Sequence, residues 1–482
     1  MDCKHTPTLT KRATTSSKKR SLTYPTKDKT TIVTNTLRDD PKACTTVLAI
    51  AQRLPQSFSQ PSHVARLGSS QREAFARDLN YARYKVWPKH LNDGDIKKWT
   101  VEFYYHPVVA HASQYAVAVH QDLLDNRVSK SSSPEALAHK VCALRLIRTM
   151  LSSGTSSDRV HASFAVGLLA THELNDEMMK AMHESNPLPF DALMPPPREL
   201  RVLSQLGLMP SHAEAFRFLL GGGMDARHVK NTGQFETWAL ADLWYSSKDY
   251  TTPTCPSPWR VDVSHFSPDP GADVPGVESA QGRGFFAEVS FGLTARALAV
   301  LTRLAALNQK MAALASTKGP RHPTWSPHHH AFMVTLNAVQ HQLLSLPPWD
   351  SLEIQERCDS SQEVYECCRL SAVIYSNAAL LALAPHTGWH ARLAHTLRLL
   401  LEKHEYNSWS GQLSAMLTWS LVVGALAAYR SHDREFFEVA LRKQVKKMQL
   451  KSWALLEEVL TNFIWSKKAC QHGAAMLWLS VK

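Results

Sequence analysis

Apolar residues recur at intervals of three and four along most of the chain, and this spacing places them on one face of an α-helix. Alternating apolar and polar runs between hairpin turns, which would indicate strands, are nearly absent. We therefore predict an all-α protein, an irregular multi-helix array of antiparallel helix pairs. After a first helix start near Ser70, the segments with helical spacing are about 134–151, 157–171, 199–206, 212–220, 235–246, 293–315, 331–346, 361–383, 390–403, 411–429, 433–449, 451–465 and 470–479.

Two further observations constrain this array. The segments 134–151 and 157–171 are separated only by a short polar stretch with Gly154, which predicts an antiparallel helix pair. The longest apolar stretch, 413–428, contains several Ser, Thr and Trp residues and is too short for a membrane span, so we interpret it as a buried core helix. No repeat of fixed length is visible, and a regular solenoid is therefore not supported.

The N-terminal segment differs from the rest in composition. Residues 1–42 contain fourteen Ser/Thr, ten Lys/Arg and four Asp/Glu, so they carry +6 of the chain's net charge of +12. Such a segment buries too little apolar surface to offset the entropy lost on ordering. We predict a disordered basic tail over 1–45 and a folded helical region over 70–482. The folded region is only mildly basic, which disfavours nucleic-acid binding by the whole body of the protein.

Two basic groups inside the tail resemble a nuclear import signal, because an extended basic strand fits acidic receptor grooves. A tail kept basic only for solubility is the alternative. The N-terminus shows no apolar secretory segment, so we expect an intracellular protein in the nucleus or, alternatively, the cytoplasm. The residues of the candidate signal are Lys11, Arg12, Lys18, Lys19 and Arg20.

Proline-rich stretches interrupt the helices at 185–198 and 251–284. Prolines at this density forbid helix and favour long exposed loops. Loops of this length are uncommon inside compact domains unless they are functional or mobile. Because the stretch 251–284 shows no binding-site chemistry, we interpret it as a mobile loop insertion in the helical region.

No constellation of residues indicates catalysis, a cofactor or a metal. The histidines His386, His390 and His395 have no carboxylate at a suitable spacing, and we interpret them as surface residues; His328–His330 are interpreted as an exposed helix start. The triplet Gly221–Gly223 follows a helical run and fits a helix end better than a phosphate loop. We therefore predict that the protein is not an enzyme.

The eight cysteines are scattered, without a disulfide framework or a CxxC pair, so reduced thiols are expected. A zinc binuclear cluster needs six cysteines within about 30 residues, whereas only Cys3 and Cys44 precede residue 140. The adjacent Cys367 and Cys368 lie in a helical pattern and are interpreted as buried packing residues.

Several segments, in order along the chain, resemble the regulatory domain of fungal transcription factors. They include a helix that ends in a Gly-Gly-apolar-Asp turn, an apolar helix with an internal Asp, and a helix that begins Cys-Arg-Leu. These segments are His212–Asp225, Trp238–Trp244, Glu366–Asn377, Met416–Ala428 followed by Arg434–Phe437, and Val459–Trp465 followed by Cys470, Gly473, Leu477 and Trp478.

The resemblance implies an all-α domain that regulates transcription, usually through protein partners or an attached DNA-binding domain. We expect a transcriptional regulator or an accessory subunit of one, and a pathway-specific role in the control of metabolic genes is possible at this stage. A cytosolic helical scaffold is the alternative. We expect protein partners, among them a separate DNA-binding regulator, and only weak, non-specific DNA binding through the tail. A second basic cluster, Arg442, Lys443, Lys446, Lys447 and Lys451, is interpreted as the solvated face of a helix.

Overall fold

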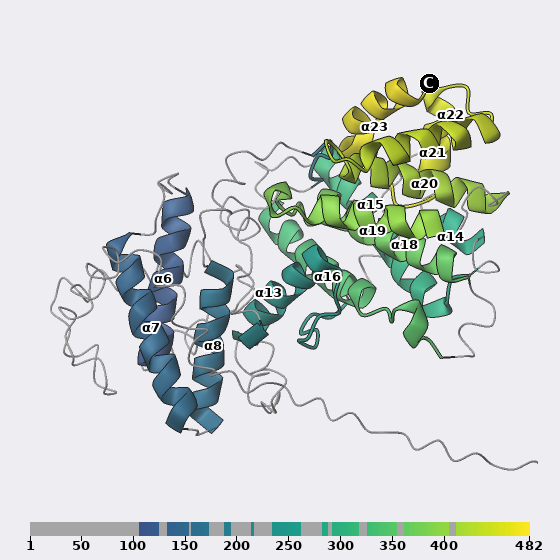
Figure 1. Cartoon of the computed structure of the whole chain (residues 1–482). Helices are drawn as coiled ribbons and strands as arrows, with labels where there is room; N and C mark the ends of the chain where they lie inside the picture. Colours follow the sequence, from purple (N-terminus) through teal and green to yellow (C-terminus); the bar gives the residue numbers. More distant parts are fainter. Residues whose placement is uncertain are drawn as a thin grey trace, which may run out of the picture. The chain divides into compact units, whose positions relative to one another are not determined.

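The computed structural model describes the chain in several stretches, which lie mostly in its C-terminal three quarters (Figure 1). No strand is present within these stretches, which agrees with the predicted all-α class. The described residues are 106–124, 133–153, 156–172, 188–193, 214–215, 234–261, 282–287, 292–317, 325–353, 361–403 and 411–482.

Thirteen α-helices occupy the described stretches. Short 3₁₀ turns at Trp349–Ser351 and Pro385–Thr387 and a π-turn at Ser376–Leu380 connect or extend them. The helices are α6 (Pro107–Leu124), α7 (Pro134–Ser153), α8 (Ser156–His172), α13 (Gln234–Asp249), α14 (Arg283–Ala287), α15 (Ala295–Thr317), α16 (Trp325–Leu344), α18 (Gln362–Tyr375), α19 (Trp389–Lys403), α20 (Gln412–Ala427), α21 (Arg434–Lys447), α22 (Trp453–Thr461) and α23 (Lys467–Val481).

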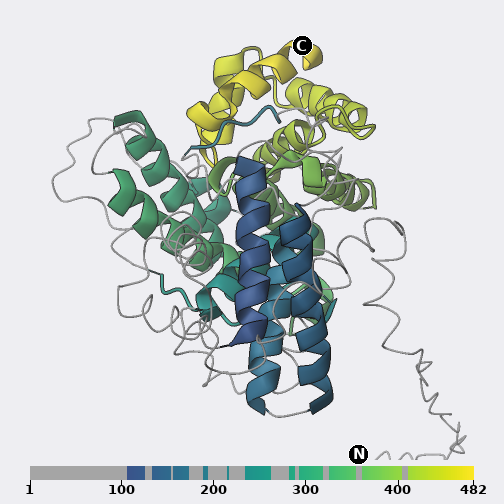
Figure 2. The ribbon, with the colours of Figure 1, turned by 90° about the vertical axis from the view of Figure 1, so that its left-hand side faces the viewer.

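Helices α6, α7 and α8 lie side by side, and α6 contacts both of the others (Figure 1 and Figure 2). We call these three helices the histidine bundle, because they bury His111, His120 and His172. The predicted antiparallel pair corresponds to α7 and α8. Helix α6 was not predicted, because buried His111 and His120 interrupt its apolar face. Pro107 stands at its first position, where a missing N–H costs nothing.

Helices α18 and α20 are the most buried of the C-terminal helices. From Met416 to Ala428 every residue is buried, which confirms the prediction of a core helix there. Gly424 allows the close approach of α21, because a Cβ at this position would lie 2.4 Å from Cε1 of Phe437. Cys367 and Cys368 are both fully buried on α18, as predicted.

An aromatic cluster fixes the short helix α14 against this core. The rings of Trp419 and Phe463 stack with centroids 5.6 Å apart, and Phe285 meets both edge-on at 5.5 and 5.2 Å. The indole N–H of Trp419 donates to the carbonyl of Ile464 at 2.9 Å. The large apolar area and the satisfied polar group together make this cluster a principal source of stability.

The first part of the proline-rich stretch packs against the helices instead of forming a mobile loop. The N–H of Cys255 donates to Oδ2 of Asp242 at 2.8 Å, and Nε2 of His341 lies 2.8 Å from the carbonyl oxygen of Cys255. Trp259 is also buried. The interpretation of a mobile insertion therefore fails for residues 251–261, and the end of the stretch overlaps helix α14.

Several predictions fall outside the described residues. They concern the tail 1–45, the helix near Ser70, the segment 199–206 and the glycine triplet Gly221–Gly223. Of the segment 212–220, only residues 214–215 are described.

Candidate functional site

Helix α19 presents two polar side chains toward the turn that joins α20 to α21. Its opposite face is apolar and buried through Trp389, Leu393, Leu397 and Leu401. His395 and Arg398 are three residues apart, so they are neighbours on one face of the helix. Their side chains are 45% and 28% exposed, respectively.

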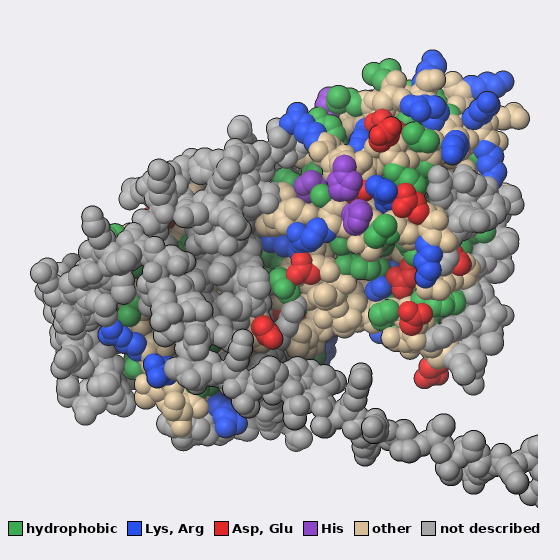
Figure 3. All heavy atoms as spheres, in the orientation of Figure 1, with side chains coloured by type: hydrophobic (Ala, Val, Ile, Leu, Met, Phe, Trp, Pro, Cys, Tyr) green, Lys and Arg blue, Asp and Glu red, His purple; other side chains and the backbone are tan. Residues whose placement is uncertain are grey.

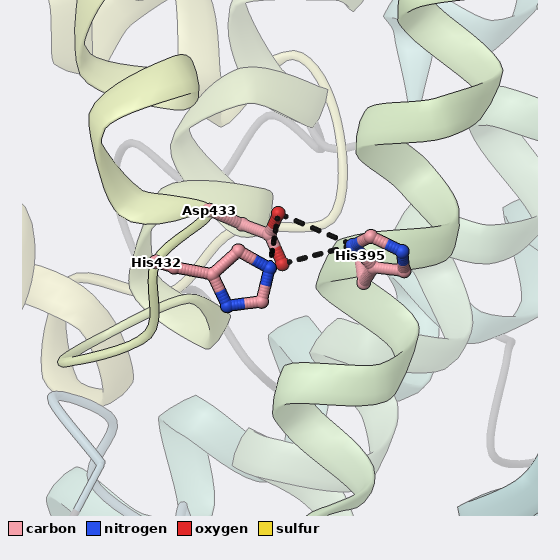
Figure 4. Close-up of side chains that lie close together, drawn as sticks. All are labelled: His395, His432 and Asp433. Carbon is pink, nitrogen blue, oxygen red and sulfur yellow. Dashed lines mark hydrogen bonds and ion pairs between the residues drawn. The ribbon is translucent and has the colours of Figure 1, made fainter.

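Asp433 occupies the N-cap position of α21, where an aspartate ordinarily accepts hydrogen bonds from the first turn of the helix. Its side chain makes no such cap bond. Instead the carboxylate faces α19 and is only 1% exposed (Figure 4). A buried carboxylate requires partners of opposite charge or hydrogen-bond donors, and these come from α19 and from the adjacent His432.

Three side chains surround this carboxylate. Nδ1 of His395 is 3.2 Å from both carboxylate oxygens of Asp433, and Nη1 of Arg398 donates to Oδ1 at 2.8 Å. Nε2 of His432 is 3.3 Å from Oδ1. Figure 4 shows the two imidazole rings on either side of the carboxylate, and we call these residues the His395–His432–Asp433 cluster.

The electrostatics favour the ionised carboxylate. Burial alone acts to raise the pKa of Asp433, but hydrogen bonds from His395 and Arg398 and the positive charges of His395 and His432 outweigh it, so the pKa lies below its ordinary value. The cluster therefore combines two imidazole nitrogens with a carboxylate whose ionised form is favoured. Such a donor set suits either an ion-pair cluster or a divalent transition metal.

This arrangement corrects one sequence interpretation. His395 has no carboxylate partner near it in sequence, but Asp433, which follows it by 38 residues, contacts it in the structure. His390 is also more than a surface residue, because Nδ1 lies 2.9 Å from the carbonyl oxygen of Ala427 and burial lowers its pKa. The side chain of His386 lies outside the description, as do those of His328–His330 at the start of α16.

A network of neutral polar side chains lies inside the C-terminal helices. Gln340 donates to Oγ of Ser247 at 3.0 Å and to Oδ1 of Asn377 at 3.2 Å, and it accepts from Ser376 at 2.7 Å. Asn377 in turn donates to the carbonyl of Ser247 at 2.7 Å. These four residues, Ser247, Gln340, Ser376 and Asn377, form what we call the amide network, and all are fully buried.

The histidine bundle instead buries titratable side chains. His106 and His161 stack with ring centroids 3.8 Å apart, and the Nδ1 atoms of His111 and His139 are 2.9 Å apart. Since two imidazoles share one hydrogen in such a bond, one of these nitrogens must donate and the other accept.

Both His106 and His172 are held neutral. Burial, helped by the charge of His161, lowers the pKa of His106 to about 4. Burial and the charge of His120 lower the pKa of His172 to about 4. None of these pairs has a third nearby Cys, His or carboxylate that completes a metal site among the described residues.

Helix α18, which contains the Cys-Arg-Leu sequence in its middle, places Arg369 in a buried cluster. Its guanidinium donates to Oε2 of Glu366 at 2.8 and 3.0 Å and to the carbonyl of Leu346 at 3.2 Å, and it lies over the ring of Tyr250 at 4.4 Å. Oε1 of Glu366 accepts from the N–H of Trp349 at 2.9 Å. Arg369 therefore joins helix α18 to Tyr250, just after α13, and to Leu346, just after α16. This role is structural.

The candidate import signal lies outside the described residues. The second basic cluster lies on and just after α21, and its five residues are exposed, as expected for the solvated face of an amphipathic helix. Figure 3 shows many Lys and Arg side chains over α21–α23 and a group of histidines over α19. No described helix has the length and apolar character that crossing a membrane requires.

The described residues thus form an all-α array with a hydrophobic interior. The family model described as the fungal specific transcription factor domain matches residues 127–461. The chain belongs to this family. No curated protein and no solved structure matches it.

Proposed function

We propose that the protein is a nuclear regulator of transcription that controls a metabolic pathway through protein contacts of its helical domain. The observation that carries this proposal is the family match over 127–461, which includes the whole helical core from α7 to α22. At the family level this domain belongs to transcription factors. The nuclear location, the pathway and the partner contacts are the parts that require tests.

A separate DNA-binding regulator is the partner that we propose. The sequence does not contain the six-cysteine pattern of a zinc binuclear cluster within its first 140 residues. A partner that carries such a module would supply sequence recognition, while this chain supplies the regulatory domain. Affinity purification of the tagged protein should recover a zinc-cluster protein, and recovery of none would contradict this part of the proposal.

Localisation provides the first test. The tagged intact protein should concentrate in the nucleus, and replacement of Lys18, Lys19 and Arg20 by Gln should reduce its nuclear fraction. The matched control replaces Arg442, Lys443 and Lys446 by Gln, which removes the same charge from exposed positions of α21. Exclusion of the intact protein from the nucleus would favour the alternative, a cytosolic helical scaffold.

Transcript profiling separates regulation from scaffolding. Deletion of the gene should change a coherent set of transcripts from one metabolic pathway, because a pathway-specific regulator acts on few genes. A scaffold without a transcriptional role should leave no coherent set changed. The latter result would contradict the proposal even if the protein were nuclear.

Direct DNA binding should be weak and without sequence preference. The candidate import signal in the tail contributes five basic residues, and five phosphate contacts would give a log–log salt slope of at most about −4.5. The second basic cluster, Arg442, Lys443, Lys446, Lys447 and Lys451, is the rival source of DNA affinity. A salt titration with several unrelated duplexes should show lower affinity when 1–42 is removed. Full affinity after this truncation, or tight binding to one sequence at physiological salt, would contradict the prediction.

A further inference from the structure

We propose that the His395–His432–Asp433 cluster binds one divalent transition metal ion of the zinc class. The ion would link α19 to the turn that precedes α21. This inference does not rest on the proposed function, because it concerns metal binding by the purified protein. It follows from the type of donor atoms, their separations and the way the carboxylate is held.

The separations of the donor atoms fit one small ion. Nδ1 of His395 is 3.2 Å from Oδ2 of Asp433, whereas the 3.3 Å contact of Nε2 of His432 is to the other carboxylate oxygen, Oδ1. All three residues offer donor atoms within 4.8 Å of one another. Zinc binds imidazole nitrogen and carboxylate oxygen at about 2.0–2.2 Å in tetrahedral geometry, which places neighbouring donors about 3.3–3.5 Å apart.

Arg398 is compatible with an ion at this position because it holds only one carboxylate oxygen. Nη1 of Arg398 donates to Oδ1 at 2.8 Å, and Oδ2 of Asp433 has no contact with the guanidinium among the hydrogen bonds of the described residues. Monodentate carboxylate ligands commonly have their second oxygen fixed by a hydrogen bond of this kind. We therefore assign Oδ2 to the metal and Oδ1 to Arg398, with the ring hydrogen of His395 on Nε2.

The side of the cluster that faces solvent leaves room for a fourth ligand. The side chain of His432 is 77% exposed and that of His395 is 45% exposed, whereas Asp433 is buried. A water molecule can therefore complete the coordination, as in other sites with three protein ligands. Two imidazoles favour zinc and its first-row neighbours over magnesium and calcium, which prefer sites built only from oxygen.

The competing interpretation is an ion-pair cluster without metal. In that case the two histidines, when protonated, and Arg398 simply neutralise Asp433. The two interpretations differ in measurable ways, because only a metal site takes up zinc in a defined ratio and is stabilised by it in proportion to the free zinc concentration.

The test uses the purified full-length chain, stripped of metal with a chelator and dialysed against buffered free zinc. The wild-type chain should bind one more zinc ion than the double variant H395Q/H432Q, and zinc should raise the Tm of the wild-type chain only. Both histidines are partly exposed, so glutamine should be tolerated without loss of folding. The matched control is H472Q, which changes an exposed histidine of α23 outside the cluster.

Single substitutions and a spectroscopic probe sharpen the test. H432Q should lower the zinc affinity at least about 100-fold, because loss of even an outer-sphere partner typically costs about 10–100-fold. Cobalt(II), used in place of zinc, should give the visible absorption of a four-coordinate ion in wild type and H472Q but not in H395Q/H432Q. Equal zinc content and affinity in wild type and H395Q/H432Q would overturn the proposal, and so would an equal loss in H472Q.

Discussion

The histidine bundle and the amide network bury polar groups of different kinds. Helices α6–α8 enclose imidazoles, two of which, on His106 and His172, have their pKa lowered to about 4. The C-terminal helices enclose Gln340, Asn377 and neighbouring hydroxyls, which do not titrate. The hydrogen bonds of the amide network are therefore the same at every physiological pH, whereas those of the histidine bundle depend on neutral rings. The comparison shows that one chain can hold one region sensitive to acid and another that is not.

The largest effect on the free energy of unfolding is expected from the aromatic cluster of Phe285, Trp419 and Phe463 in the C-terminal helices. Trp419→Ala should lower the free energy of unfolding by about 3–5 kcal/mol, because it leaves a cavity beside Phe285 and Phe463. Urea unfolding monitored by circular dichroism measures this change in the free energy of unfolding. Leu455→Ala is the control, since Leu455 is 41% exposed and its truncation should change stability by less than about 0.5 kcal/mol. Equal losses of unfolding free energy in Trp419→Ala and Leu455→Ala would mean that the aromatic cluster is not a principal source of stability.

Acid should act next most strongly, and more on the histidine bundle than on the amide network. The pKa of His172 is about 4 in the folded chain and near the ordinary histidine value of 6.5 in the unfolded chain. Because the unfolded chain binds the proton first, this contribution to stability is present above pH 6.5 and is lost as the pH falls toward 4. At pH 5 the expected loss is about 2 kcal/mol from this residue.

Hydrogen exchange followed by mass spectrometry can separate the two regions. Peptides from 107–124 should exchange faster at pH 5 than at pH 7.5, after correction for intrinsic rates, and peptides from 412–427 should not. His172→Gln should reduce the pH difference, whereas His472→Gln, at an exposed position, should leave it unchanged. Uniform acceleration of both regions would contradict the proposed difference.

A smaller and pH-independent effect is expected inside the amide network. Gln340→Leu removes the partner of Ser376 and one partner each of Ser247 and Asn377, so it should cost about 2 kcal/mol. The cost should be the same at pH 7.5 and pH 5. Gln342→Leu, on the same helix, is the control, because its partner Arg303 forms an exposed bond. If the loss of unfolding free energy in Gln340→Leu changed with pH, the amide network would not be insensitive to acid, and the expected difference between the two regions would be contradicted.

The sequence predicted the apolar helices well and the polar interior poorly. The segment around Met416–Ala428 was predicted as a core helix because nearly all its residues are apolar, and the structure buries every one. Helix α6 was missed because buried His111 and His120 look polar in any periodicity count. Helical spacing thus finds faces that are buried by apolar groups and overlooks faces that are buried by paired polar groups.

The candidate site was missed for a different reason. His395 and Arg398 meet Asp433 across 38 and 35 residues, so no local spacing connects them. An aspartate just before a helix is ordinarily a cap, and the sequence gives no sign that Asp433 faces α19 instead. The sequence signal that could have found the site is the adjacent pair of His432 and Asp433 at the start of a helix. A helix cap requires only the carboxylate, so the neighbouring imidazole is an additional type of metal ligand.

The smallest effect concerns the thiols, which can report on each region separately. Cys367 on α18 is fully buried, and burial raises its pKa to about 11 although hydrogen bonds with Ser420 and Ser371 lower it. Cys142 on α7 is only partly buried, and burial raises its pKa to a lesser extent. Since the thiolate is the reactive form, iodoacetamide at pH 7.5 should modify Cys142 slowly and leave Cys367 unmodified in the native chain. Mass spectrometry of the digested protein measures both sites.

Trp419→Ala should expose Cys367 more than Cys142, because its cavity opens beside α18. Modification of Cys367 at the rate of Cys142 in the wild-type chain would show that the C-terminal core opens as readily as the histidine bundle, and would contradict the expected difference between the two regions.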